Sequence, residues 1–119
     1  MIKYALPQEN KELNISIEDF VKLYKKDKAI LLDVRMPFER ELWEVKFAIK
    51  LSPNEIEENI NKLPKDKLII TVCPNQKRSP FVAVYLKEKG FNAKFLDGGL
   101  IELMQFLKGK EAKNFKERK

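Results

Sequence analysis

Apolar residues follow two kinds of spacing along this chain. Some form continuous runs, which are typical of strands covered on both faces, and others recur every three or four residues, which predicts helices that bury one face. Strands separated by helices favour an α/β fold with a mostly parallel sheet and helices on both faces. The expected strands are 29–34, 67–73, 92–96 and a short strand or extended segment at 46–51; the expected helices are 16–27, 37–45, 52–63, 79–90 and 100–109.

Capping signals support several of these boundaries. Ser16 is the expected N-cap of the first helix, with an aspartate three residues later. Ser52 is followed directly by a proline and, three residues on, by a glutamate, which is a strong helix start. A second Ser-Pro pair begins at Ser79, and Gly90 is the expected stop of the helix that starts there.

Length and composition indicate one folded domain. The chain has 119 residues and 44% hydrophobic residues, with 4 Gly and 6 Pro, which fits a globular protein with a real core. No apolar stretch approaches the ~18 residues that span a membrane, and the N-terminal segment turns polar too early for a secretory signal. We therefore expect a cytoplasmic protein without a membrane partner, with a domain over 1–107 and a basic C-terminal tail at 108–119.

The net charge of +6 is concentrated in that tail. Its twelve residues carry six basic and two acidic side chains, so they hold +4 and the remaining 107 residues hold +2. Nucleic-acid-binding domains usually show a basic stripe with interleaved aromatic residues or a known module, and neither is present. We expect a solvated tail and no nucleic-acid partner. The alternative, DNA or RNA binding through the tail, predicts salt-dependent binding that is lost on deleting 108–119.

The single cysteine, Cys73, stands between the strand at 67–73 and the helix that begins at Ser79. In parallel α/β folds, ligands bind beyond the carboxyl ends of the strands. The thiol would lie near the unpaired N–H groups of a helix N-terminus and near Lys77 and Arg78, all of which stabilise a thiolate. Taken alone, this placement leaves open both a nucleophilic cysteine and a buried structural one.

The absence of histidine narrows the chemistry further. It excludes metal sites built on Cys/His clusters and the Ser-His and Cys-His catalytic pairs. One cysteine also excludes an intrachain disulfide. We therefore expect no metal and no cofactor.

Three blocks of sequence resemble the single-domain rhodaneses, which are sulfurtransferases of the rhodanese homology family. LLDVRMPFERE at 31–41 resembles the family's Asp-Val-Arg signature and the helix after it. IITVCPNQKRS at 69–79 resembles its strand and active-site loop, with a cysteine, four residues, an arginine and a serine. VAVYLKEKGFNAKFLDGGLIEL at 82–103 resembles the helix, strand and Gly-Gly-helix that follow. The resemblance runs from about Ile15 to Phe106 and implies a five-stranded parallel sheet flanked by helices.

The resemblance implies transfer of sulfane sulfur. Cys73 would attack a small anionic donor such as thiosulfate, or a persulfide, and carry the sulfur as its own persulfide to a thiol, a protein or cyanide. No general base is needed if the thiolate already exists. Lys77 and Arg78 would bind the anionic donor, and the full set of expected substrate-binding residues is Asn75, Gln76, Lys77, Arg78 and Ser79.

Four further matched residues are expected to be structural. Asp33 and Arg35 could be interpreted as an acid/base pair, but the resemblance implies that they hold the neighbourhood of the loop together by polar contacts. Gly98 and Gly99 are expected to allow a tight turn and the close approach of a helix.

The sequence departs from the family pattern at two places and leaves alternatives open. Gln76 stands where the family loop commonly has glycine, and WEVKFAIK at 43–50 replaces the usual Gly-His-Ile-Pro-Gly-Ala. One alternative is therefore a rhodanese-like module that carries sulfur or binds a protein with little or no turnover. Another is a phosphatase or arsenate reductase, whose related loops place five residues between cysteine and arginine; this loop has four.

Overall fold

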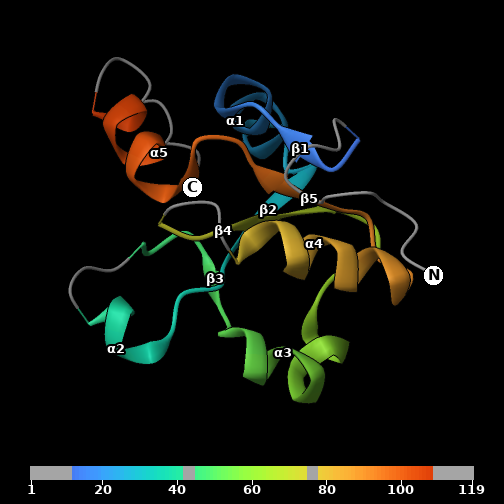
Figure 1. Ribbon diagram of the computed structural model, residues 1–119. Helices are drawn as coiled ribbons and strands as arrows, with labels where there is room; N and C mark the ends of the chain where they lie inside the picture. The colour runs from blue at the N-terminus through green and yellow to red at the C-terminus, as the bar shows by residue number, and fades with distance from the viewer. Residues whose placement is uncertain (1–11, 42–44, 75–77, 109–119) are drawn as a thin grey trace.

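The computed structural model describes residues 12–41, 45–74 and 78–108, and five strands form one sheet at its centre (Figure 1). The strands are β1 (Asn14–Ile15), β2 (Ala29–Asp33), β3 (Ile49–Lys50), β4 (Leu68–Val72) and β5 (Ala93–Leu96). The helices are α1 (Ile17–Lys25), α2 (Pro37–Arg40), α3 (Pro53–Asn59), α4 (Ser79–Glu88) and α5 (Gly99–Leu107), with a 3-10 helix η2 (Ile60–Lys62) after α3.

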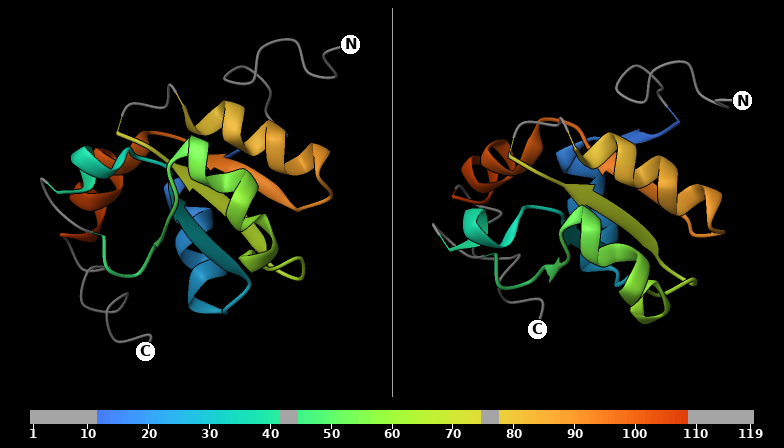
Figure 2. Two further views of the ribbon diagram at one scale, coloured as in Figure 1. Left: turned by 90° about the horizontal axis from the view of Figure 1, so that it is seen from below. Right: turned by 60° about the horizontal axis from the view of Figure 1, so that its bottom comes forward.

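All strand pairs are parallel, in the order β1-β5-β4-β2-β3. The central strand β4 pairs with β2 from Leu68 opposite Ala29 to Val72 opposite Asp33. Because the strands are parallel, their carboxyl ends lie at one end of the sheet. The left view of Figure 2 shows α2, the start of α4 and α5 gathered beyond that end. The α/β fold with a five-stranded parallel sheet is confirmed.

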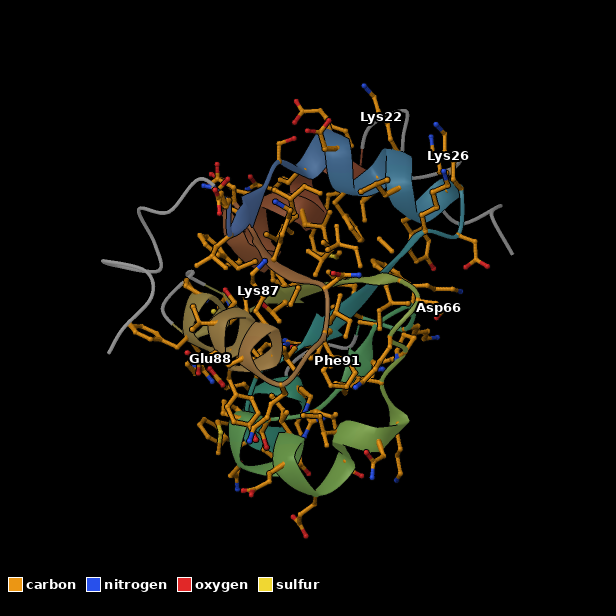
Figure 3. All side chains as sticks on the ribbon, turned by 90° about the vertical axis from the view of Figure 1, so that its right-hand side faces the viewer. Lys22, Lys26, Asp66, Lys87, Glu88 and Phe91 are labelled. Carbon is orange, nitrogen blue, oxygen red and sulfur yellow. The ribbon has the colours of Figure 1, made fainter. Side chains whose placement is uncertain are left out.

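Helices cover both faces of the sheet, with α1 and α5 above it and α3 and α4 below it in Figure 1. Each face has its own hydrophobic core. In Figure 3, Lys22 projects outward from α1, whereas Phe91 lies in the core below the sheet. The upper core includes Phe20, Leu31, Ile70, Val72, Leu100 and Leu103, and the lower core includes Leu32, Ile56, Ile69, Cys73, Val82, Ala83 and Leu86.

The division into two cores explains the continuous apolar runs of β2 and β4. Successive side chains of a strand point to opposite faces, so a strand with helices on both sides is apolar at nearly every position. Ile69 enters the lower core and Ile70 the upper core. Cys73, directly after β4, falls on the lower side, which faces α4.

The predicted helix boundaries at Ser16, Ser52 and Gly90 are confirmed. The Asp19 amide donates to Ser16 Oγ at 3.1 Å, which caps α1. A capping box starts α3, in which the Ser52 amide donates to Glu55 Oε1 at 2.8 Å. Gly90 follows α4 with a φ of +94°, a conformation that glycine adopts without steric strain.

The short elements differ most from the sequence predictions. β3 has two residues rather than six, and it pairs with β2 at the edge of the described sheet. α2 ends at Arg40, and of the remaining predicted helical residues, 42–44 lie outside the described residues. β1, with two residues, was not predicted from the apolar pattern. Elements of this length contain too few side chains to show a period.

Among the residues that the structure describes, no helix combines the length and apolarity needed to cross a membrane.

Candidate active site

Cys73 lies where β2, β4 and α5 meet at the carboxyl end of the sheet. It follows Val72, the last residue of β4. The Val34 amide donates to the Val72 carbonyl at 3.0 Å, which continues the β2–β4 pairing beyond the strands. The Leu100 amide, in the first turn of α5, donates to the Cys73 carbonyl at 3.0 Å. The backbone on both sides of the thiol is thus fixed by neighbouring elements.

The sulfur of Cys73 is at hydrogen-bonding distance from the first residue of α4. The Ser79 amide donates to Cys73 Sγ at 3.4 Å, and the thiol lies 3.5 Å from Ser79 Oγ, to which it donates. Neither Cys73 nor Ser79 has exposed surface. The sulfur therefore packs against the lower core on one side and against a helix N-terminal N–H on the other, where the helix dipole favours negative charge.

A buried hydroxyl holds Ser79 in this position. Thr71, in β4, has no exposed surface, and its Oγ1 donates to the Ser79 carbonyl at 2.8 Å. This bond joins the strand before the cysteine to the helix after it. Sequence reasoning missed Thr71, although a hydroxyl inside an otherwise aliphatic strand is a signal that it has a specific partner.

Gly99 allows α5 to approach the cysteine closely, and Gly98 forms the turn before it. The φ angles of Gly98 and Gly99 are +96° and +77°, in the region that favours glycine. A Cβ atom on Gly99 would lie 2.8 Å from the Pro74 carbonyl oxygen and 3.1 Å from that of Cys73. A side chain at Gly99 would therefore press on the backbone that carries Cys73.

Asp33 and Arg35 form a buried ion pair. Arg35 Nη2 donates to Asp33 Oδ2 at 2.8 Å, and Arg35 Nε donates to both carboxylate oxygens. The Arg35 amide also donates to Asp33 Oδ1, at 3.1 Å. The exposed fractions are 0% for Asp33 and 1% for Arg35. The pair fixes the turn after β2, which is the polar role that the resemblance implied.

A second ion pair joins α2 to α4. Arg78, the N-cap residue of α4, directs Nη1 at Glu39 Oε1 at 2.5 Å and Nη2 at Glu39 Oε2 at 2.7 Å. The Met36 amide also donates to Glu39 Oε1, at 2.8 Å. Sequence reasoning did not single out Glu39. Its place, three residues into the helix start after Met36, predicts a capping role but gives no sign of a partner 39 residues away.

The pair changes the proton affinity of both groups. The hydrogen bonds from Arg78, more than any other contact, lower the pKa of Glu39 from its ordinary 4.5 to about 2, while partial burial opposes the shift. The same carboxylate raises the pKa of Arg78, to which the nearby Cys73 and Asp33 also contribute. Both groups are therefore charged at neutral pH.

The other expected loop residues, Asn75, Gln76 and Lys77, lie outside the described residues, so their predicted contacts with a donor stay predictions. Within 12–41, 45–74 and 78–108, no three His, Cys, Asp or Glu side chains gather in a way that could hold a metal ion.

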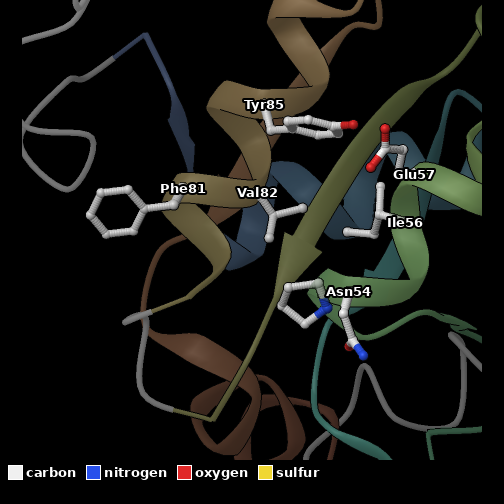
Figure 4. Close-up of a pocket in the computed structure, with 7 residues that line it drawn as sticks. Asn54, Ile56, Glu57, Phe81, Val82 and Tyr85 are labelled. Atoms are coloured by element: carbon white, nitrogen blue, oxygen red, sulfur yellow. The ribbon is translucent and has the colours of Figure 1, made fainter.

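A shallow groove between α3 and α4 lies apart from the cysteine. Its volume is about 310 Å³. Figure 4 shows Ile56 and Glu57 of α3 on one side and Val82 and Tyr85 of α4 on the other, with Phe81 pointing away from them. Cys73 does not line it.

Comparison with known sequences assigns the family. The model of the rhodanese-like domain matches residues 16–105, a range that includes Cys73 and both ion pairs. The chain belongs to the rhodanese-like domain family.

Curated relatives of this rhodanese-like chain carry two kinds of name. One is the tRNA uridine(34) hydroxylase of Wigglesworthia glossinidia brevipalpis, 30% identical over an alignment of 101 positions that covers 79% of this chain and 32% of that protein. Another is "Putative sulfurtransferase YtwF" of Bacillus subtilis (strain 168), 30% identical over 80 residues, which are 67% of this chain and 78% of that protein. The chain spans about a third of the hydroxylases that it matches.

Solved structures agree with the fold. A rhodanese-related protein from Thermoplasma volcanium is 25% identical, with a TM-score of 0.68 over 77% of this chain and 90% of that one. A rhodanese-like domain protein from Staphylococcus aureus is 25% identical, with a TM-score of 0.65 over 72% of this chain and 85% of that one. These solved structures share the α/β fold of the rhodanese-like chain.

Proposed function

We propose that this rhodanese-like protein transfers sulfane sulfur through a persulfide on Cys73. The observation that carries the proposal is the position of Cys73 Sγ, which accepts a hydrogen bond from the Ser79 amide at the N-terminus of α4. An N–H donor and a helix dipole both stabilise a thiolate more than a thiol. The thiolate is the nucleophilic form, so the site needs no histidine to activate it.

The reaction has two steps that balance without an oxidant. The Cys73 thiolate attacks the outer sulfur of a donor such as thiosulfate or a persulfide. The S–S bond of the donor breaks, and its electron pair leaves with sulfite or with a thiolate. An acceptor thiolate or cyanide then attacks the outer sulfur of the Cys73 persulfide, and the electron pair of that S–S bond returns to Cys73.

Ser79 and Arg78 support this proposal from the described part of the loop. In the thiolate state, the Ser79 hydroxyl can reverse its present role and donate to Cys73 Sγ across the same 3.5 Å. Arg78 is the N-cap residue of the helix whose N–H faces the sulfur, and Cys73 is among the groups that raise the pKa of Arg78. Asn75, Gln76 and Lys77 are proposed to complete the contacts with the donor.

Mass spectrometry tests the proposal directly. The intact protein, treated with thiosulfate or with cysteine persulfide, should gain the mass of one sulfur atom, and cyanide should remove it. Cys73→Ser should abolish the gain. Cys73 packs in the lower core, so its substitution also needs a folding control. The circular dichroism spectrum of Cys73→Ser is compared with that of the wild type to show that the variant is folded. Sulfur transfer by a folded Cys73→Ser protein would overturn the proposal.

The same measurement decides between an enzyme and a carrier. A sulfur carrier would gain one sulfur on Cys73 and release it only to a particular protein partner, with no turnover on small acceptors. This is the alternative that the replacement of the usual loop glycine by Gln76 favours. Steady release of thiocyanate in the presence of thiosulfate and cyanide identifies the enzyme.

The hydroxylase relatives favour a second candidate, a rhodanese-like part of a tRNA-modifying protein. The basic residues of 108–119 provide the charge for such a role. If this candidate is right, the protein should bind tRNA with an affinity that falls steeply with salt, and deleting 108–119 should weaken that binding while sulfur transfer to Cys73 continues. Equal tRNA affinity with and without the tail would count against it.

A further inference from the structure

The proposed reaction does not explain why the arginine beside the reactive cysteine is already paired. Both terminal nitrogens of Arg78 face the two carboxylate oxygens of Glu39, at 2.5 and 2.7 Å. This two-bond arrangement uses the edge of a guanidinium that also suits sulfur and phosphorus oxyanions. A donor anion and Glu39 therefore compete for the same two nitrogens.

Glu39 is held in place by contacts other than Arg78. The Met36 amide donates to Glu39 Oε1 at 2.8 Å, and Arg35 Nη1 lies 3.5 Å from the Glu39 carbonyl oxygen. Arg35 is itself fixed by the buried carboxylate of Asp33. A carboxylate that is positioned in advance loses little conformational freedom when it binds its partner. An incoming anion must displace a ligand that is already in place.

The charges around the sulfur cancel in pairs. Asp33 balances Arg35, and Glu39 balances Arg78. With Cys73 as a thiolate, the described part of the site therefore carries a net charge of −1. These described charges, from which Lys77 is left out because it lies outside the described residues, repel a dianion such as thiosulfate. A persulfide in its uncharged form, R–S–SH, is not repelled.

We propose that Glu39 selects the sulfur donor: by holding Arg78, it disfavours dianionic thiosulfate and favours an organic persulfide, R–S–SH. This inference rests on the sulfur transfer proposed above. The Cys73 thiolate attacks the outer sulfur of R–S–SH, the S–S bond breaks, and the electron pair leaves with RS⁻. The proton stays on the transferred sulfur as Cys73–S–SH. The charge is −1 before and after the step, and no external oxidant or reductant is consumed.

The competition is tested by measuring thiosulfate binding in the Cys73→Ser background, in which no sulfur is transferred. The variants below are all made in this background. Glu39→Gln keeps an oxygen for the Met36 amide but removes the negative charge, so thiosulfate should bind about tenfold more tightly. Removing both partners, in Glu39→Gln with Arg78→Ala, should return the affinity to within about twofold of the Cys73→Ser protein. Glu41→Gln, which removes the same charge from an exposed position at the end of α2, is the matched control and should change the affinity less than twofold.

Three results would overturn the inference. They are an unchanged affinity in Glu39→Gln, an equal gain in Glu41→Gln, and a loss of about tenfold or more in the double variant, which would show that Arg78 already binds the dianion beside Glu39. If Glu39→Gln does not fold, the double variant decides alone. It leaves no uncompensated charge and is therefore the safer change.

Donor selectivity is then measured with Cys73 present. The rate constant for persulfide formation on Cys73 should rise about tenfold with thiosulfate in Glu39→Gln, while the rate constant with cysteine persulfide stays within about threefold. A parallel rise for both donors would overturn the selectivity. If wild-type Cys73 gains sulfur from neither donor, the proposed function fails, and the binding series still decides separately whether Glu39 competes with anions.

Discussion

Two ion pairs lie near Cys73, and they differ in burial and in reach along the chain. Asp33 and Arg35 are two residues apart, with exposed side-chain fractions of 0% and 1%. Glu39 and Arg78 are 39 residues apart, with exposed fractions of 22% and 31%. The first pair is closed to any solute. The second joins two elements at the surface of the site and can exchange one partner for an anion from solution.

The difference separates structural support from adjustable charge. A buried pair is costly to break because the remaining charge has no water to solvate it, whereas a partly exposed pair contributes less to stability and responds to solvent. We therefore expect changes in the Asp33–Arg35 pair to act mainly on folding. Changes in the Glu39–Arg78 pair should act mainly on which donor reacts.

Asp33→Asn should have the largest effect on stability. It leaves the Arg35 charge buried without its carboxylate, which should lower the free energy of unfolding by about 3–5 kcal/mol, measured by urea denaturation.

The matched control is Asp27→Asn. Asp27 pairs with Lys67 at 2.8 Å but is 64% exposed, and its φ of +60° is one that asparagine tolerates. This change should cost less than about 1 kcal/mol. Equal losses at the two positions would show that burial does not distinguish the pairs.

Gly99→Ala changes no charge, so its effect on stability is a reference for the two ion-pair substitutions. The new methyl group would press on the carbonyl oxygens of Pro74 and Cys73 at a φ of +77°. We expect a loss of roughly 1–3 kcal/mol, between the effects at the two ion pairs. Sulfur transfer should slow as well, because α5 supports the backbone on which the thiol sits. Gly90→Ala is the control, at a similar φ but away from the cysteine. It should destabilise the protein and leave the rate of sulfur transfer per folded molecule unchanged.

Glu39→Gln should have a smaller effect on stability, about 1–2 kcal/mol at pH 7, because the Arg78 charge that it leaves can reach water. Thermal unfolding compared with Glu41→Gln separates this loss from the effect of net charge. A loss as large as that of Asp33→Asn would mean that the Glu39–Arg78 pair is also structural and does not differ in role from the Asp33–Arg35 pair.

The elements predicted correctly from the sequence are those in which apolar residues form a run or recur at a regular spacing. β2 and β4 were predicted to within two residues because both faces of each strand are covered, so nearly every position is apolar. The start of α3 was predicted because its cap is local in sequence. The two-residue strands β1 and β3 depend on pairing with distant strands, and nothing in their own residues specifies that pairing.

The same limit applies to the site. Cys73, Ser79 and the Asp33–Arg35 pair could be placed from the sequence, since each depends on a strand end or a helix start. The role of Glu39 could not be predicted from the sequence. Its partner, Arg78, precedes α4, which follows β4 in the chain, and the contact forms only when α2 and α4 pack together. Sequence analysis therefore described Arg78 as a residue that binds the donor, without the carboxylate that competes for it.

The smallest predicted effect is in the pH dependence of stability. The pKa of Glu39 is about 2 in the fold, lowered chiefly by the hydrogen bonds from Arg78, against an ordinary 4.5. A carboxyl group with a lowered folded pKa stabilises the protein above its unfolded pKa, and this contribution declines as the pH falls from about 4.5 toward 2. The difference in unfolding free energy between wild type and Glu39→Gln should therefore be constant above about pH 6 and shrink below pH 4.5. Other acidic groups, such as Glu55, whose pKa is lowered mainly by the Ser52 amide, titrate in both proteins and cancel in the difference. A difference that stays constant down to pH 3 would show that the contribution of Glu39 comes from packing and capping of α2 rather than from its charge, and the pair would then offer no competition to an anionic donor.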